Sequence, residues 1–252
     1  MSAPGRRVMF VTGGSRGIGA GLVEGAAAAG FDVAFTYKER HDAADAVCAR
    51  VGASTPEARC RAYRLDVRDP AAVECVGDRV LDDFGDVHVV VANAAITHAG
   101  LAFSTSDEDW RAVLETNLTG AFYVARQFLP ALLANGFGRF IFMSSIAAHG
   151  MSGDVAYCAS KAGMLGLSAA LAKEYGRKGI TSNALLLSLF ETDMTDRELP
   201  EDKRDYYRRH SPVGRAGRIS DVAAAVLYLA SDAAGFVNGQ TIGVTGGLDW
   251  FH

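Results

Sequence analysis

A glycine-rich turn near the amino terminus constrains the fold of this chain more than any other feature. The apolar residues 8–11 run directly into Thr12-Gly13-Gly14-Ser15-Arg16-Gly17-Ile18-Gly19, and a helical pattern follows. A strand that ends in glycines and opens a helix directs free backbone N–H groups and the positive end of the helix dipole at one point. An ordinary turn would not need this cluster of glycines. The turn therefore predicts a dinucleotide pyrophosphate site lined by Gly13, Ser15, Arg16, Gly17, Ile18 and Gly19.

Short apolar runs alternate with longer helical patterns along the rest of the chain. The predicted strands are residues 8–11, 33–35, 62–65, 87–91, 140–143, 184–187 and 241–244. The predicted helices are residues 20–29, 43–51, 71–84, 110–133, 155–177 and 222–229. Several strands are apolar at every position, as in parallel strands that are buried on both faces. The pattern predicts an α/β fold, a Rossmann-like doubly wound parallel sheet of about seven strands with helices on both faces.

Composition narrows the class of protein. The 252 residues are 49% hydrophobic and 21% charged, which suits a single domain over residues 1–252, with the polar stretch 191–210 as a helical lid over the active site. The net charge of −4, without a basic block, disfavours nucleic-acid binding. No apolar run approaches the roughly 20 residues of a membrane span. The four cysteines and six histidines lack metal-ligand spacing, so we expect no metal site and a cytoplasmic protein with free thiols.

The end of the second predicted strand bears on the choice of dinucleotide. A NAD site usually has an acidic residue there to bind the ribose hydroxyls, but this chain has Thr36-Tyr37-Lys38-Glu39-Arg40. Arg16, Lys38 and Arg40 can neutralise a 2′-phosphate. The sequence therefore favours NADPH, bound also by Tyr37 and Lys38, although Glu39 argues mildly against a phosphate nearby. The alternative is that some of these charges only face solvent.

Tyr157 and Lys161 form the strongest candidate for chemistry. Residues four apart on a helix share one face, and a nearby ammonium lowers the pKa of a phenol from about 10. Such a tyrosine can donate a proton to a carbonyl that receives hydride. A chance surface pair is the common alternative, but this pair follows a predicted strand that ends in Ser144-Ser145.

The order of several motifs resembles that of the short-chain dehydrogenase/reductase family. The motifs are Thr12-Gly-x3-Gly17-x-Gly19, Asp66-Val67, Asn93-Ala94-Ala95, Asn117, Ser144-Ser145 and Tyr157-x3-Lys161. Within the family, the chain is most similar to 3-oxoacyl-(acyl-carrier-protein) reductases and polyketide ketoreductases. The phrases that carry this closer likeness are Gly13-Gly-Ser-Arg-Gly-Ile-Gly19, Glu191-Thr-Asp-Met194, Pro212-Val-Gly-Arg215 and residues 239–247.

The resemblance implies a role for each matching residue. Tyr157 would be the general acid, and Ser145, or else Ser144, would hydrogen-bond the substrate carbonyl. Lys161 would bind the nicotinamide ribose and tune Tyr157, and Asn117 would hold a water in a proton relay unless it is a buried asparagine satisfied by backbone. The remaining cofactor contacts would be Asp66 and Val67 at the adenine (Asp66 being otherwise a helix cap), Asn93 and Ala94 beside the cofactor (Asn93 being otherwise a support of the sheet), and Phe190 and Thr192 at the carboxamide.

Two positions depart from the family pattern. Ala95 stands where glycine is usual, and Leu187-Ser188 stands where the family has Pro-Gly in the turn that faces the nicotinamide. Either the substrate pocket is altered or the cofactor site is weakened. We favour an altered pocket, because Tyr157, Lys161, Asn117 and the serine pair are intact.

These features together predict an NADPH-dependent reductase that converts a 3-oxoacyl thioester to its 3-hydroxyacyl product, in fatty-acid or polyketide biosynthesis. The alternatives are a reductase or dehydrogenase of a free ketone, cyclic polyketide or steroid-like alcohol, and an NADP-binding regulator or scaffold. The expected partners are a small-molecule or carrier-bound acyl substrate and further copies of the chain in a homotetramer. The basic run 203–209 is a candidate contact for an acyl carrier protein, or is otherwise a solvated helix face. Further candidate pocket residues are His98, Phe103, His149 and Met151.

Overall fold

Seven parallel strands form one sheet in the order β3-β2-β1-β4-β5-β6-β7 in the computed structural model, which describes residues 5–191 and 201–248. The reversal between β1 and β4 is the switch point of a doubly wound sheet. The predicted α/β fold is therefore confirmed. The strands are β1 (Val8–Val11), β2 (Asp32–Tyr37), β3 (Cys60–Arg64), β4 (Val89–Ala92), β5 (Gly138–Ser145), β6 (Ile180–Leu187) and β7 (Thr241–Val244).

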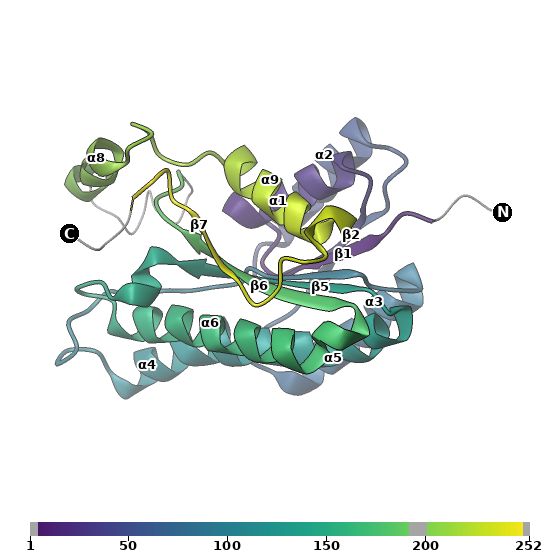
Figure 1. Ribbon diagram of the computed structural model, residues 1–252, viewed down its shortest axis with the longest axis horizontal. Coiled ribbons are helices and arrows are strands. Elements are labelled where there is room, and N and C mark those ends of the chain that lie inside the picture. The colour runs from purple at the N-terminus through teal and green to yellow at the C-terminus, as the bar shows by residue number, and fades with distance from the viewer. Residues whose placement is uncertain (1–4, 192–200, 249–252) are drawn as a thin grey trace.

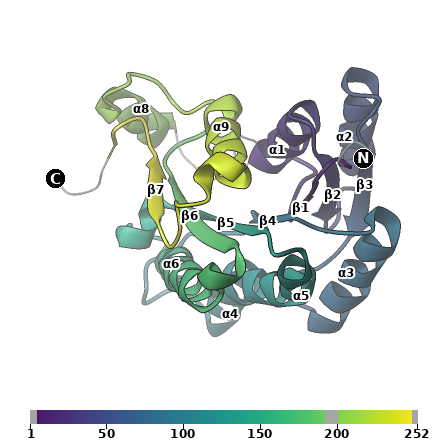
Figure 2. The same cartoon turned by 45° about the vertical axis from the view of Figure 1, so that its right-hand side comes forward.

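Helices cover both faces of the sheet (Figures 1 and 2). One layer consists of α1 (Gly17–Ala28), α2 (His41–Ser54) and α9 (Ile219–Ala230). The other consists of α3 (Pro70–Phe84), α4 (Asp107–Leu114), α5 (Gly120–Asn135) and α6 (Val155–Tyr175). Helix α8 (Glu201–His210) lies beyond the end of the sheet at which β5 and β6 finish (Figure 1). The short turns are η1 (Glu115–Thr119), η2 (Ile146–His149), η3 (Gly176–Lys178) and η4 (Asp232–Ala234).

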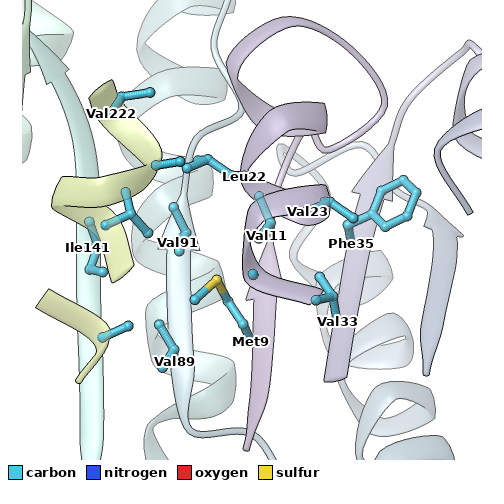
Figure 3. Close-up of a cluster of buried hydrophobic side chains, with 14 of the residues drawn as sticks. Met9, Val11, Leu22, Val23, Val33, Phe35, Val89, Val91, Ile141 and Val222 are labelled. Carbon is cyan, nitrogen blue, oxygen red and sulfur yellow. The ribbon is translucent and has the colours of Figure 1, made fainter. Parts of the chain in front are cut away.

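The central strands are buried on both faces, which explains their continuous apolar sequences. Figure 3 shows one of the two cores, in which strand side chains such as Met9 and Val91 lie under Leu22 of α1 and Val222 of α9. The opposite core contains Phe10, Phe128 and Phe142. Burial of this kind is the main stabilising contribution to the fold. It holds the carboxyl ends of the strands at one edge, where the candidate site lies.

Strand β6 is longer than expected because it includes polar residues that the apolar pattern did not count. Ser182 and Asn183 belong to β6, although they interrupt its apolar pattern. The hydroxyls of Ser182 and Ser168 lie 3.0 Å apart, and Asn183 donates to the carbonyl of Val237 at 2.8 Å. Buried polar groups are tolerated where they are hydrogen-bonded.

Two expected helices need comment. The predicted helix 110–133 is divided, because α4 and α5 are separated by the π-helical turn η1, which carries Asn117. The segment Val155–Lys178 is long and apolar enough to cross a membrane by length and composition. It is a core helix here, because Met164 and Leu171 are buried against the sheet.

A cationic cluster lies at the amino ends of the strands, opposite the candidate site. The ring of Phe137 lies between the guanidinium groups of Arg7 and Arg139, 3.9 Å and 4.0 Å from its centroid. Arg7 also donates to both carboxylate oxygens of Asp232, at 3.1 Å and 3.0 Å. Arg139 is buried and donates to the carbonyl oxygens of Gly138 and Ser231. A cation–π contact contributes about 0.5–1 kcal/mol at an exposed site and about 2 kcal/mol where the cation is desolvated, as buried Arg139 is.

Candidate active site

The glycine turn has the backbone conformation that its sequence predicts. Gly13 and Gly17 have φ angles of 67° and 53°, which favour glycine. A Cβ at Gly19 would lie 2.1 Å from the carbonyl oxygen of Gly13, so only glycine fits there. Helix α1 begins at Gly17 without a side-chain cap or an acid in its first turn. Its first N–H groups are therefore available to an anion in the adjoining pocket.

We expect Gly19→Ala to weaken dinucleotide binding at least tenfold and to lower Tm by several degrees. The added methyl would meet backbone atoms, and overpacking of this kind typically costs about 1–3 kcal/mol. Titration of the cofactor and thermal unfolding measure the two effects. Gly25→Ala is the matched control on the same helix, because its Cβ would make an ordinary 3.5 Å contact with Ala223. Equal behaviour of the two variants would contradict the role given to Gly19.

Thr12 and Asn93 hold this turn against the end of β4. The hydroxyl of Thr12 accepts hydrogen bonds from the backbone N–H groups of Asn93 and Ala94, both at 2.9 Å. The Asn93 amide donates to the carbonyl oxygens of Thr12 and Gly13, at 2.9 Å and 3.2 Å. The side chain of Asn93 thus has a structural role in holding the turn, and Asn93 also lines the pocket described below. The part played by Thr12 was missed, although its place directly before Gly13 was a signal.

A pocket of about 500 Å³ runs along the carboxyl edge of the sheet. The glycine turn, the segments after β2 and β3, and candidate catalytic residues all line this pocket. Asn117 is not among its lining residues, and Thr192 lies outside the described residues. The predicted residues that line it are Gly13, Ser15, Arg16, Gly17, Ile18, Gly19, Tyr37, Lys38, Asp66, Val67, Asn93, Ala94, Ser145, Tyr157, Lys161 and Phe190.

The end of the pocket beside β2 and β3 is rich in charge. Arg68 donates to both carboxylate oxygens of Asp66, and Lys38 forms an ion pair with the same carboxylate at 3.2 Å. The hydrogen bonds from Arg68 hold the pKa of Asp66 well below its usual range. Arg40 pairs with Asp42 at 3.0 Å. Exposed Arg16 makes no ion pair with any described residue, so of the three predicted cations it is the one that no carboxylate neutralises.

Tyr157 and Lys161 lie on one face of α6, as their spacing predicts. The amine of Lys161 is 5.4 Å from the centroid of the Tyr157 ring, and both side chains line the pocket. Lys161 is buried and donates to the carbonyl oxygen of Met143 at 2.6 Å. The phenol therefore stands at the pocket wall, with the amine fixed behind it by the end of β5.

Burial changes the charge of Lys161. The side chain is fully enclosed, and this desolvation lowers its pKa to about 7. Its contacts are a neutral carbonyl and the sulfur of Met164, so no carboxylate opposes the shift. The sequence pairing assumed a permanent ammonium. In the structure the amine changes charge near neutral pH, and anionic phosphates in the pocket would raise its pKa again.

The two serines at the end of β5 have different environments. Ser144 is buried, and its hydroxyl donates to the carbonyl oxygen of Lys161 at 2.9 Å. Ser145 is half-buried, and its oxygen accepts the N–H of Ala147 at the start of η2. That bond leaves the Ser145 O–H group able to donate into the pocket. The geometry favours Ser145 as the carbonyl ligand.

We expect Ser145→Ala to lower kcat about 100-fold, because an oxyanion donor contributes 10²–10³ in rate. Ser144→Ala is the matched control, since its hydroxyl is committed to the α6 backbone. It should lower Tm with a much smaller effect on kcat. Steady-state kinetics of the two variants would reveal a reversed assignment if Ser144→Ala lost more activity.

Asn117 is completely buried in the π-helical turn, and its side-chain amide is hydrogen-bonded to other protein groups. Its amide oxygen accepts from the N–H of Ile96 at 2.9 Å, and its amide nitrogen donates to the Ile96 carbonyl and the Ser160 hydroxyl. This is the alternative of a buried asparagine satisfied largely by backbone. The side chain ties the loop after β4 to α6, and a water relay through Asn117 stays a prediction.

The departures from the family pattern also lie at the pocket. Leu187 and Ser188 line it, and the Ser188 hydroxyl donates to the carbonyl of Thr245 at 3.2 Å. Leu187 is buried in the core and pairs with Val244 of β7. Ala95 lines the pocket without a positive φ, as is true of every described residue that is not glycine.

Helix α8 contacts the loop before α6. The Tyr207 hydroxyl donates to the sulfur of Met151 at 3.7 Å, and its ring packs beside Ile146, Leu186 and Leu248. Its basic residues are largely neutralised by acids nearby. Arg208 pairs with Glu201, Asp205 and Glu191, while Arg204 pairs with Glu201 and Arg209 with Asp205. These pairs favour the interpretation of a solvated helix face.

The arrangement combines an anion-binding turn with a phenol, a hydroxyl and a buried amine on one pocket. It can hold a dinucleotide and give a proton to an oxygen on which charge develops. Residues 5–191 and 201–248 contain no cluster of three histidine, cysteine or carboxylate side chains that would hold a metal.

Comparisons with known proteins agree with this geometry. A family model described as enoyl-(acyl carrier protein) reductase matches residues 13–249. The 3-oxoacyl-(acyl-carrier-protein) reductase FabG of Escherichia coli (strain K12) is 37% identical over 243 residues, covering 96% of this chain and 97% of that protein. An acetoacetyl-CoA reductase of Rhizobium meliloti (strain 1021) is 40% identical over 244 residues, covering 96% and 98%.

Solved structures show the same fold. A putative short-chain alcohol dehydrogenase from Sinorhizobium meliloti 1021 superposes with a TM-score of 0.91 at 31% identity, covering 96% of each chain. Levodione reductase also gives a TM-score of 0.91, at 28% identity and with 96% of each chain covered. The fold, the pocket and these relatives lead to one conclusion: the chain belongs to the short-chain dehydrogenase/reductase family, as a ketoreductase-like oxidoreductase with an NAD(P) cofactor.

Proposed function

We propose that the protein is an NADPH-dependent reductase that converts 3-oxoacyl thioesters to 3-hydroxyacyl products, in fatty-acid or polyketide-type biosynthesis. The observation that carries this proposal is that Tyr157, Ser145 and Lys161 open onto the same pocket as the glycine turn. The printed names of two relatives, a 3-oxoacyl-(acyl-carrier-protein) reductase and an acetoacetyl-CoA reductase, support a 3-oxoacyl thioester substrate.

The side chains divide the work of ketone reduction. NADPH supplies the hydride when it is bound. The phenol of Tyr157 gives its proton to the substrate oxygen, while the Ser145 hydroxyl donates a hydrogen bond to the same oxygen as its negative charge grows. Lys161 positions the nicotinamide ribose, and its own position is fixed by the carbonyl of Met143. Protonated Lys161 stabilises the phenolate that remains on Tyr157.

The preference for NADPH over NADH is supported by the charges at the end of β2. The last residue of β2 is Tyr37, and no acid stands at the position that usually binds the ribose hydroxyls. Arg16 extends from the turn without an opposing carboxylate, whereas Lys38 shares Asp66 with Arg68. Arg16 is therefore proposed as the main partner of the 2′-phosphate.

We expect Arg16→Ala to raise the KM for NADPH by about tenfold or more and to leave the KM for NADH nearly unchanged. Hydrogen bonds between charged groups contribute about 1.5–3 kcal/mol, and 1.4 kcal/mol corresponds to tenfold. Steady-state kinetics with both cofactors measure the effect. Arg50→Ala is a suitable control, because Arg50 pairs with Glu24 on the surface. An equal rise of both KM values would contradict the phosphate contact.

The proposal is tested by NADPH oxidation with a panel of ketones. Acetoacetyl-CoA, the acetoacetyl thioester of an acyl carrier protein, and a free cyclic diketone are compared under single-turnover and steady-state conditions. Higher kcat/KM with either thioester supports the proposal. The cyclic diketone represents the second candidate, a reductase of free ketones, which the resemblance to levodione reductase and the Leu187-Ser188 wall favour. Tight NADPH binding without oxidation by any ketone would instead indicate a regulator or scaffold.

The domain organisation, cellular location and oligomeric state of the enzyme form part of the same proposal. We propose a single-domain subunit in a cytoplasmic homotetramer, with segment 191–210 as a substrate lid, of which residues 192–200 lie outside the described part of the chain. Exposed Trp110, Phe122 and Leu133 on α4 and α5, and exposed Tyr228 and Phe236 near β7, support contacts between subunits. Light scattering during size-exclusion chromatography gives the mass in solution, and a monomer would contradict this assembly. The paired arginines of α8 give no support to carrier docking there, so a carrier partner is decided by the ketone panel.

A further inference from the structure

Two thiols meet beneath α2, away from the catalytic pocket. Cys48 lies in α2, Cys60 opens β3, and their sulfur atoms are 3.9 Å apart. Both side chains are half-buried against the core shared by α1, α2 and α9. Cys75 is exposed on α3, and Cys158 contacts the carbonyl of Met151, so neither has a second thiol beside it among the described residues.

The two cysteines lie on elements that pack against each other. Helix α2 packs directly on the edge strand β3 (Figure 2), and only the segment 55–59 separates the two elements. A disulfide needs a sulfur separation of roughly 2.05 Å, so the thiols must approach by about 2 Å. Strand β3 is the last strand of the sheet, so the pair lies at the edge of the fold.

The contact between the thiols makes them chemically different. The Cys60 S–H group donates to the sulfur of Cys48. This hydrogen bond lowers the pKa of the Cys48 thiol, and the same contact together with burial raises the pKa of the Cys60 thiol. Asp45 acts against the shift at Cys48, and Glu24 adds to the rise at Cys60. A thiolate is the reactive form of cysteine, so Cys48 is the stronger nucleophile of the pair.

We propose that Cys48 and Cys60 form an oxidisable dithiol, in which Cys48 reacts with a hydroperoxide and Cys60 then closes an intramolecular disulfide. The Cys48 thiolate attacks one peroxide oxygen, the O–O bond breaks, and a sulfenic acid forms as hydroxide or alkoxide leaves and takes a proton. The Cys60 sulfur then attacks the Cys48 sulfur and displaces the hydroxyl group, which leaves as water with the Cys60 proton. Two thiols lose two electrons and two protons, and the peroxide is reduced.

The disulfide would join two elements that adjoin residues lining the dinucleotide pocket. Helix α2 begins directly after Lys38, Glu39 and Arg40, and its first residue, His41, bonds the Tyr37 hydroxyl at 2.9 Å. Strand β3 runs at its other end into Leu65 and Asp66. The cysteine pair therefore lies on the two elements that flank Lys38, Arg40 and Asp66, at the end of the pocket where the 2′-phosphate is expected.

Peptide mapping of the purified full chain tests the bond. The reduced protein is treated with hydrogen peroxide, its remaining thiols are alkylated, and it is digested with trypsin without reductant. Cleavage after Arg40, Arg50, Arg59 and Arg61 should yield the peptide 41–50 linked to the peptide 60–61, at a mass two hydrogens below their sum. Dithiothreitol should restore both free peptides. Alkylated Cys48 and Cys60 after full peroxide treatment would overturn the proposal.

Single substitutions test the two roles. Cys60→Ser should leave a sulfenic acid on Cys48 that a dimedone probe labels, whereas Cys48→Ser should leave Cys60 largely unlabelled. The reverse labelling would overturn the assignment. Cys75→Ser is the matched control, because Cys75 is the more exposed thiol but lacks a partner, and the variant should form the linked peptide as the wild type does. Loss of the linked peptide in Cys75→Ser would also contradict the pairing.

Discussion

Tyr157→Phe should reduce kcat about 1,000-fold while the Kd for NADPH changes by less than about threefold. General acid catalysis contributes 10²–10⁴ in rate, and phenylalanine has no proton to give. The aromatic ring is retained, so its packing near the Lys161 amine and the shape of the pocket persist. Steady-state kinetics give kcat, and fluorescence titration of NADPH gives the Kd.

A second tyrosine on the same helix provides the control. Tyr175 ends α6 and packs against the core that contains Phe128, outside the pocket. Tyr175→Phe should keep the wild-type kcat. Near wild-type turnover in Tyr157→Phe would refute its assignment as the acid, and a parallel loss in Tyr175→Phe would indicate damage to the helix instead.

Lys161→Met should remove a pH dependence of stability that the wild type shows. The folded pKa of Lys161 is about 7 against 10.5 when it is exposed, so between these values the unfolded chain binds more protons than the folded one. The free energy of unfolding therefore rises with pH over this interval, from its lowest value below pH 7. The shift corresponds to about 3–5 kcal/mol, at 1.36 kcal/mol per pKa unit.

Urea unfolding at about pH 7 and about pH 10 measures this difference. Other groups titrate over the same range, so the prediction concerns the wild type minus the variant. Methionine has a similar volume and no charge, and it should stabilise the protein at pH 7 while abolishing turnover. Lys173→Met, on the exposed side of α6, should keep the wild-type slope. Parallel profiles for wild type and Lys161→Met would contradict the burial effect.

Local sequence patterns were sufficient for the fold and for most of the pocket. Most strands had an apolar run of their own, although β3 contains two arginines, and the turn at Gly13–Gly19 needed only its neighbouring strand and helix to be interpreted. The lining residues followed from motif positions at the carboxyl ends of parallel strands. The match of this pattern to its family covers nearly the whole chain.

Contacts between distant segments account for what the sequence did not reveal. Lys38 follows β2 and Asp66 follows β3, so their ion pair was not visible in the sequence. The pKa of Lys161 depends on burial by the end of β5, and the bonds of Asn117 depend on a π-helical turn that a periodic pattern does not register. Cys48 and Cys60 likewise come together only when α2 folds onto β3.

The guanidinium groups stacked on Phe137 lie at the opposite edge of the sheet from the candidate active site. Candidate catalytic residues line the pocket at the carboxyl ends of the strands, whereas Arg7, Arg139 and Asp232 clamp their amino ends. We therefore expect substitutions at this clamp to change thermal stability without replacing a residue that lines the pocket. A directed-evolution library for a more durable biocatalyst would begin at this clamp.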